Sequence, residues 1–137
     1  KTTDGVVVTL SSKSDTTARM VRLQVVDSKI IRVTAVPGRK FPKEKSLVVL
    51  PEAYKKTPFT VEESDGRLRL ETDAVRAMVD LETGEVAFAD TCGTMRLQER
   101  RGGGKKFKPI TVDGVSAYSY WQQFESPDNE AFYGLVR

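Results

Sequence analysis

Apolar and polar residues alternate along most of this chain, and no other feature constrains its fold as strongly. Successive side chains of a β-strand point to opposite faces, so a strand with one buried face is apolar at every second position. Segments 21–25 and 31–35 show this pattern on either side of the turn 27–29. No segment keeps a helical 3.6-residue period over three turns. The chain is therefore predicted to consist mainly of strands.

The same pattern recurs at short intervals through the middle of the chain. Residues 59–62 and 67–71 alternate on either side of Ser64-Asp65-Gly66, a typical hairpin turn. Short strands that turns separate are typical of a sandwich or barrel of antiparallel sheets. We therefore predict an all-β antiparallel β-sandwich with one helical turn, 52–56, after Pro51. Further strands are predicted at 6–10, 47–50, 75–81, 86–89 and 95–97, with a long final segment from Ile110 to Phe124.

Length and composition exclude several classes of enzyme. A chain of 137 residues has the size of one domain and is much shorter than the roughly 250 residues of a (β/α)₈ barrel. The absence of histidine excludes histidine-dependent nucleophiles and metal sites, and the single Cys92 excludes an internal disulfide. We predict one domain without a metal or cofactor. No apolar run approaches the roughly 18 residues of a membrane span, so none is predicted.

Two basic loops suggest an anionic partner at first sight. Neither has the Gly-Lys-Ser/Thr sequence and following helix of a phosphate-binding loop. Because 19 acidic residues are interleaved with 22 basic ones, we interpret both as solvated surface loops and predict no nucleic-acid partner. A nucleic-acid-binding barrel is a remote alternative, and its affinity would fall steeply with salt. The loops are the triplet 102–104 with Arg100, Arg101, Lys105 and Lys106, and the cluster Arg39, Lys40, Lys43 and Lys45.

The aromatic residues near the end of the chain are better candidates for binding. Tyr118, Tyr120 and Trp121 lie in the final predicted segment, where packing in the core or at a sheet edge is the simplest interpretation. Adjacent residues of a strand face opposite sides, so Tyr120 and Trp121 are both buried only if both faces of the sheet are covered. One of these two is therefore a candidate for contact with a sugar or another domain. Neighbouring carboxylates such as Glu62 and Glu63 lie near turns, and their spacing supports no catalytic pair.

The last fifth of the chain resembles a known enzyme family. Residues 118–135 read YSYWQQFESPDNEAFYGL, and their end, EAFYGL, is similar to the E-x-F-Y-G-L/F-G-E/Q segment of glycoside hydrolase family 31, the α-glucosidase and α-xylosidase family. The preceding QQFE, residues 122–125, resembles the bacterial branch that includes α-xylosidases. Residues 31–34 and 86–97 are also similar to strand and hairpin patterns of the family. Where the family continues with Gly and then Glu or Gln, this sequence has Val136 and Arg137.

This resemblance implies a galactose-mutarotase-like N-terminal β-sandwich, 1–137, in which 126–137 begins the junction to an absent catalytic (β/α)₈ barrel of the same polypeptide. The two catalytic aspartates of the family belong to the barrel, so the chain alone is predicted to be inactive. A carbohydrate substrate is then an indirect partner, which Tyr120 or Trp121 would approach in the substrate cleft. The apolar residues Phe132, Tyr133 and Leu135 are predicted to dock on the barrel.

A free-standing carbohydrate-binding β-sandwich is the alternative, because such a module would also expose aromatic side chains. Family members that act on plant or dietary glycans are often exported, so we expect a periplasmic or secreted location, although no signal-like stretch is present. The sequence determines neither the preferred α-linked sugar nor the oligomeric state.

Overall fold

The structure is a computed structural model that describes residues 1–11, 14, 16–42 and 50–131. These residues form antiparallel sheets of three, five and two strands. The three-stranded sheet contains β1 (Gly5–Thr9), β2 (Met20–Asp27) and β3 (Ile30–Val36); the five-stranded sheet contains β4 (Thr60–Ser64), β5 (Arg67–Glu71), β6 (Val75–Asp80), β7 (Val86–Asp90) and β8 (Met95–Gln98); the third contains β9 (Lys105–Val112) and β10 (Val115–Gln122). A short 3₁₀ helix, η1, spans Pro51–Ala53. The predicted all-β antiparallel fold is confirmed.

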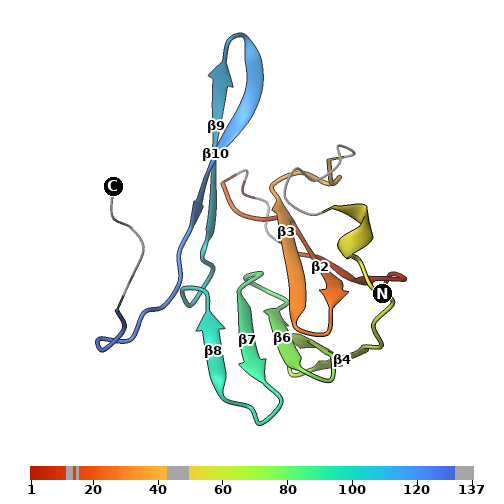
Figure 1. The fold of residues 1–137 in the computed structure, drawn as a ribbon. Helices are drawn as coiled ribbons and strands as arrows, with labels where there is room; N and C mark the ends of the chain where they lie inside the picture. The colour runs from red at the N-terminus through yellow and green to blue at the C-terminus, as the bar shows by residue number, and fades with distance from the viewer. Residues whose placement is uncertain (12–13, 15, 43–49, 132–137) are drawn as a thin grey trace.

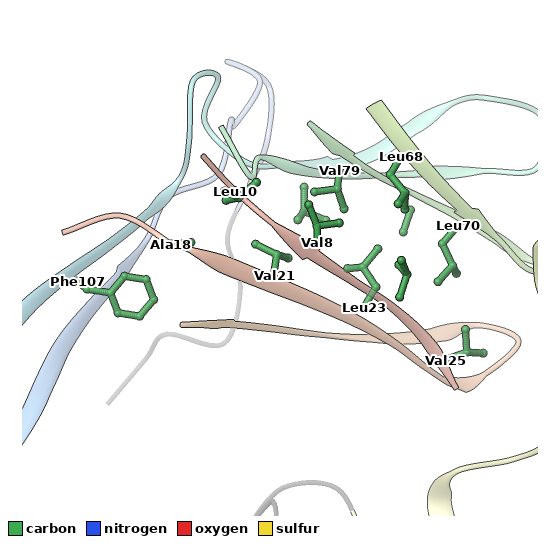
Figure 2. Close-up of a cluster of buried hydrophobic side chains, with 13 residues drawn as sticks. Val8, Leu10, Ala18, Val21, Leu23, Val25, Leu68, Leu70, Val79 and Phe107 are labelled. Carbon is green, nitrogen blue, oxygen red and sulfur yellow. The ribbon is translucent and has the colours of Figure 1, made fainter. Parts of the chain in front are cut away.

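The two larger sheets pack face to face and enclose the core between them (Figure 2). Val21 and Leu23 of β2 and Leu70 of β5 have an exposed fraction of 0%. Their positions follow the alternation, because residues two apart on a strand share a face. Burial of this apolar surface, at about 25 cal/mol per Å², is the main force that holds the two sheets together.

Two hairpins turn through an Asp-Gly pair. In β4–β5, Asp65 and Gly66 have φ angles of 51° and 72°; in β9–β10, Asp113 and Gly114 have φ angles of 50° and 79°. Positive φ at both central residues favours Asp or Asn followed by Gly, and its twist matches that of the flanking strands. The first turn confirms the predicted hairpin. The second divides the segment that was predicted to run unbroken from Ile110 to Phe124.

Other local predictions need correction. The helical turn predicted at 52–56 is instead the 3₁₀ helix that begins at Pro51 and ends at Ala53. The basic loop predicted around the triplet 102–104 is shorter, because β9 already begins at Lys105, whose side chain is buried. Lys105 is therefore not part of a solvated loop. Several predicted features lie outside the described residues: most of the strand 47–50, the loop residues Lys43 and Lys45, and the docking residues Phe132, Tyr133 and Leu135.

The β9–β10 hairpin stands out from the sandwich (Figure 1). Within the described part of the chain, its two strands pair with each other and with no other strand. After β10 the chain returns to the free edge of β8, where Glu125 N–H donates to the Gln98 carbonyl over 2.9 Å. No helix among the described residues is long and apolar enough to cross a membrane. The residues at the tip of the hairpin are exposed, and the segment after it returns to the edge of the five-stranded sheet.

Candidate functional site

The strand register of the hairpin decides where the candidate aromatic residues lie. Residues that pair directly across antiparallel strands project from the same face. Tyr120 pairs with Phe107, whereas Trp121 pairs with Lys106. Tyr120 and Trp121 therefore project from opposite faces of the hairpin, with exposed fractions of 47% and 50%. The two rings cannot form one binding platform.

The face that carries Tyr120 is attached to the sandwich through Phe107. Phe107 is buried and belongs to the core cluster, and its N–H donates to the carbonyl of Thr16 over 2.9 Å. The ring of Tyr118 meets Phe107 edge to face, with centroids 6.1 Å apart, and the ring of Tyr120 lies tilted at 5.0 Å. Edge-to-face and tilted pairs at these distances are favourable arrangements of aromatic rings. The base of the hairpin is therefore fixed to the core by an aromatic cluster.

A buried ion pair lies beside this cluster and joins four strands or their ends. Lys105, the first residue of β9, forms an ion pair with Glu99, and the two side chains are 3% and 4% exposed. The Lys105 ammonium also donates to the carbonyl of Gly84 over 2.9 Å. The Glu99 carboxylate accepts from Val86 N–H of β7 over 3.0 Å and from the Gln122 side-chain amide of β10 over 2.9 Å. Burial lowers the pKa of Lys105, and the negative charge of Glu99 opposes that effect.

The same network reaches the hydroxyl of Tyr120, which donates to the Gln122 side-chain oxygen. Burial, together with the charge of Glu99, raises the pKa of Tyr120 to about 12. Tyr120 is consequently protonated at neutral pH and does not supply a phenolate base or nucleophile. Its chemistry is that of a neutral hydroxyl donor beside a partly exposed ring.

An open groove of about 580 Å³ lies between β8 and the segment 125–130. Two carboxylates line it, and each already accepts a hydrogen bond: Glu125 from Arg101 N–H over 3.0 Å, and Glu130 from the Ser126 hydroxyl over 2.6 Å. These contacts hold the backbone after β10 in place. Among the described residues, no group of three or more acidic or cysteine side chains is arranged to hold a metal ion.

The fold defines the chain as a galactose-mutarotase-like β-sandwich, and comparison with known proteins assigns the family. The chain belongs to the family of glycosyl hydrolase 31 N-terminal galactose mutarotase-like domains, whose profile matches residues 20–135. It is also similar to the crystal structure of the GH31 α-xylosidase from Xanthomonas citri, with 38% identity and a TM-score of 0.81 over 94% of this chain. The chain spans 14% of the length of that protein. The resemblance inferred from the final segment is confirmed at the level of the family.

The structure places Tyr120 and Trp121 on the same hairpin but on opposite sides, and their approach to a substrate cleft stays a prediction. Sequence reasoning missed the Glu99–Lys105 pair, because Lys105 was assigned to a basic loop. One signal was available: Lys105 and Phe107 are two residues apart and share a strand face. A lysine that shares a strand face with a phenylalanine can lie beside the core. A buried lysine needs a counter-charge, and Glu99 lies six positions before Lys105.

Proposed function

We propose that this chain is the non-catalytic N-terminal domain of an α-glycosidase that removes α-linked xylose. In this proposal the domain packs on the catalytic barrel of the same polypeptide and helps to shape its substrate cleft. The observation that carries the proposal is the 38% identity to an α-xylosidase over 94% of this chain, combined with the 14% of that protein that the chain spans. A parent protein as long as that α-xylosidase would have room for a complete catalytic barrel in addition to these 137 residues.

The assay compares the full-length parent protein with the 137-residue chain on aryl α-xyloside and aryl α-glucoside substrates. We expect the parent protein to hydrolyse the α-xyloside faster and the chain alone to hydrolyse neither. A faster reaction with the α-glucoside would contradict the assignment of the sugar. Turnover by the chain alone that disappears on replacement of one of its carboxylates would contradict the non-catalytic role.

The role in the cleft is tested by two variants of the full-length protein, Tyr120→Ala and Trp121→Ala. The two rings project from opposite faces of the hairpin, so at most one face is turned to the substrate. We expect one variant to lower kcat/KM for the α-xyloside while the other, as its matched control, leaves it close to the parent value. Unchanged kinetics in both variants would show that neither ring shapes the cleft. Phe132, Tyr133 and Leu135 remain the predicted contacts with the barrel.

The exposed rings of Tyr118, Tyr120 and Trp121 are the observation in favour of a free-standing carbohydrate-binding module. The scaffold role is preferred because Trp121 does not share a face with the two tyrosines. Calorimetry of the 137-residue chain with an α-xylosylated oligosaccharide distinguishes the two functions. Saturable binding that is lost in Trp121→Ala would favour the binding module, and absence of binding is the result expected for the scaffold.

A further inference from the structure

The two ends of the β9–β10 hairpin carry apolar residues on different faces. Near the base, Phe107 packs in the core of the sandwich, and the partly exposed ring of Tyr120 on the same face lies against it. Towards the tip, apolar pairs lie on the opposite face: Ile110 pairs with Ala117, and Val112 pairs with Val115. We call these four residues, Ile110, Val112, Val115 and Ala117, the tip patch. It projects from the face opposite to the one that holds the hairpin on the sandwich.

The tip is amphipathic in the manner of a sheet with one buried face. Thr111 pairs with Ser116 between the two apolar pairs, so polar residues project from one face and the tip patch from the other. A one-sided alternation of this kind is typical of antiparallel strands whose apolar face is covered. In the described structure the patch is open to solvent, with exposed fractions of 52% for Val112 and 66% for Val115.

Among the residues that the structure describes, the tip of the hairpin lacks the packing partner that an isolated pair of strands needs. Two-stranded sheets are marginally stable in water unless a further strand or a packed face supports them. The aromatic cluster around Phe107 supports the base of this hairpin, but the tip stands beyond the sandwich (Figure 1). The tip patch is an apolar surface against which another part of a protein can pack.

We propose that the tip patch is a docking surface for the part of the parent polypeptide outside residues 1–137. This inference rests on the proposed function, in which the chain is one domain of a longer enzyme. The related α-xylosidase has 14% of its length in common with this chain, so a parent of similar size has ample chain to cover the patch. The patch carries no charged side chain, and on the same face the polar pair Lys108 and Ser119 borders it towards the base, with Asp113 at the turn. An apolar centre with a polar rim is the composition of a contact surface between protein parts.

The test uses two variants of the full-length protein, Val115→Cys and Ser116→Cys, each with one cysteine in addition to Cys92 of this chain. They are labelled with a maleimide, and the label is quantified by mass spectrometry of the peptide that carries the new cysteine. Both positions are exposed in the 137-residue chain, but they project from opposite faces. We expect Val115→Cys to react about tenfold or more slowly than Ser116→Cys in the native protein, because labelling of a covered site requires local opening. In denaturant the two rates should be equal. The pair Val112→Cys and Thr111→Cys repeats the comparison if either first variant does not fold.

Equal labelling rates in the native protein would overturn the proposal. Protection that disappears when the protein is diluted to a monomer would assign the patch to a second copy, and protection that requires added oligosaccharide would assign it to the ligand; both results also overturn it. Hydrolysis of the aryl α-xyloside is measured on the same samples. Hydrolysis with equal labelling refutes the docking surface alone, whereas protection without hydrolysis refutes the proposed function alone.

Discussion

Replacement of Lys105 by methionine is the sharpest test of how the hairpin is attached to the sandwich. The methionine side chain is unbranched and one heavy atom shorter, and it loses the ion pair with Glu99 and the 2.9 Å hydrogen bond to the Gly84 carbonyl. Glu99 then retains two hydrogen bonds, from Val86 and Gln122, in a site where its side chain is 4% exposed. Removal of one partner from a buried ion pair costs about 3–5 kcal/mol, because the remaining charge has lost both water and its counter-charge.

Urea unfolding of the 137-residue chain measures this loss, and its single tryptophan, Trp121, reports on the base of the hairpin. With an m value of about 1.5 kcal/mol per M, a loss of about 3 kcal/mol lowers the midpoint by about 2 M. The matched control is Lys55→Met, which breaks the ion pair with Asp27 at a lysine that is 67% exposed. We expect a far smaller change in the control, because water solvates both groups of an exposed pair.

A double-mutant cycle completes the test. Glu99→Gln alone leaves the Lys105 ammonium buried without its ion-pair partner and with only the weaker attraction of Glu85, so it should also be destabilising. In the double variant no buried charge remains, and its loss of stability should be smaller than the sum of the two single losses. A loss below about 1 kcal/mol for Lys105→Met, or simple additivity in the cycle, would refute the argument that this pair fastens the hairpin.

Two further measurements test the sandwich itself. Leu70→Ala truncates a side chain with an exposed fraction of 0% and should cost about 2–5 kcal/mol of stability in the same urea assay. Leu97→Ala, at a position that is 43% exposed, should cost much less. Similar losses in the two variants would contradict the assignment of the core. Asp80 accepts a 2.8 Å hydrogen bond from Thr83 N–H, which is the main cause that lowers the pKa of Asp80 below its ordinary value of 3.8. A carboxyl with a lowered folded-state pKa stabilises the fold above pH 3.8, and this contribution is lost as the pH falls through the folded-state pKa. Asp80→Asn should therefore flatten the acid side of the stability curve, and an unchanged curve would contradict this origin.

Several parts of the structure follow from local sequence alone. The β4–β5 hairpin could be predicted because alternating residues surround a turn whose Asp65 and Gly66 tolerate positive φ. The Asp113-Gly114 turn carries the same signal and was missed, because residues 110–124 were interpreted as one long segment. That error was one of interpretation, since the information lies within a few residues of the turn.

The tertiary structure decided what two-residue periodicity leaves open. Alternation placed Tyr120 and Trp121 on opposite faces, but only the packing of Phe107 on the core shows which face of the hairpin meets the sandwich. The sequence likewise shows that Lys105 is charged. Its burial depends on Glu99, which the fold brings to it from across the glycine turn. Strands and turns are local because each depends on neighbouring φ/ψ angles, whereas burial and pairing depend on surfaces that meet only once the chain has folded.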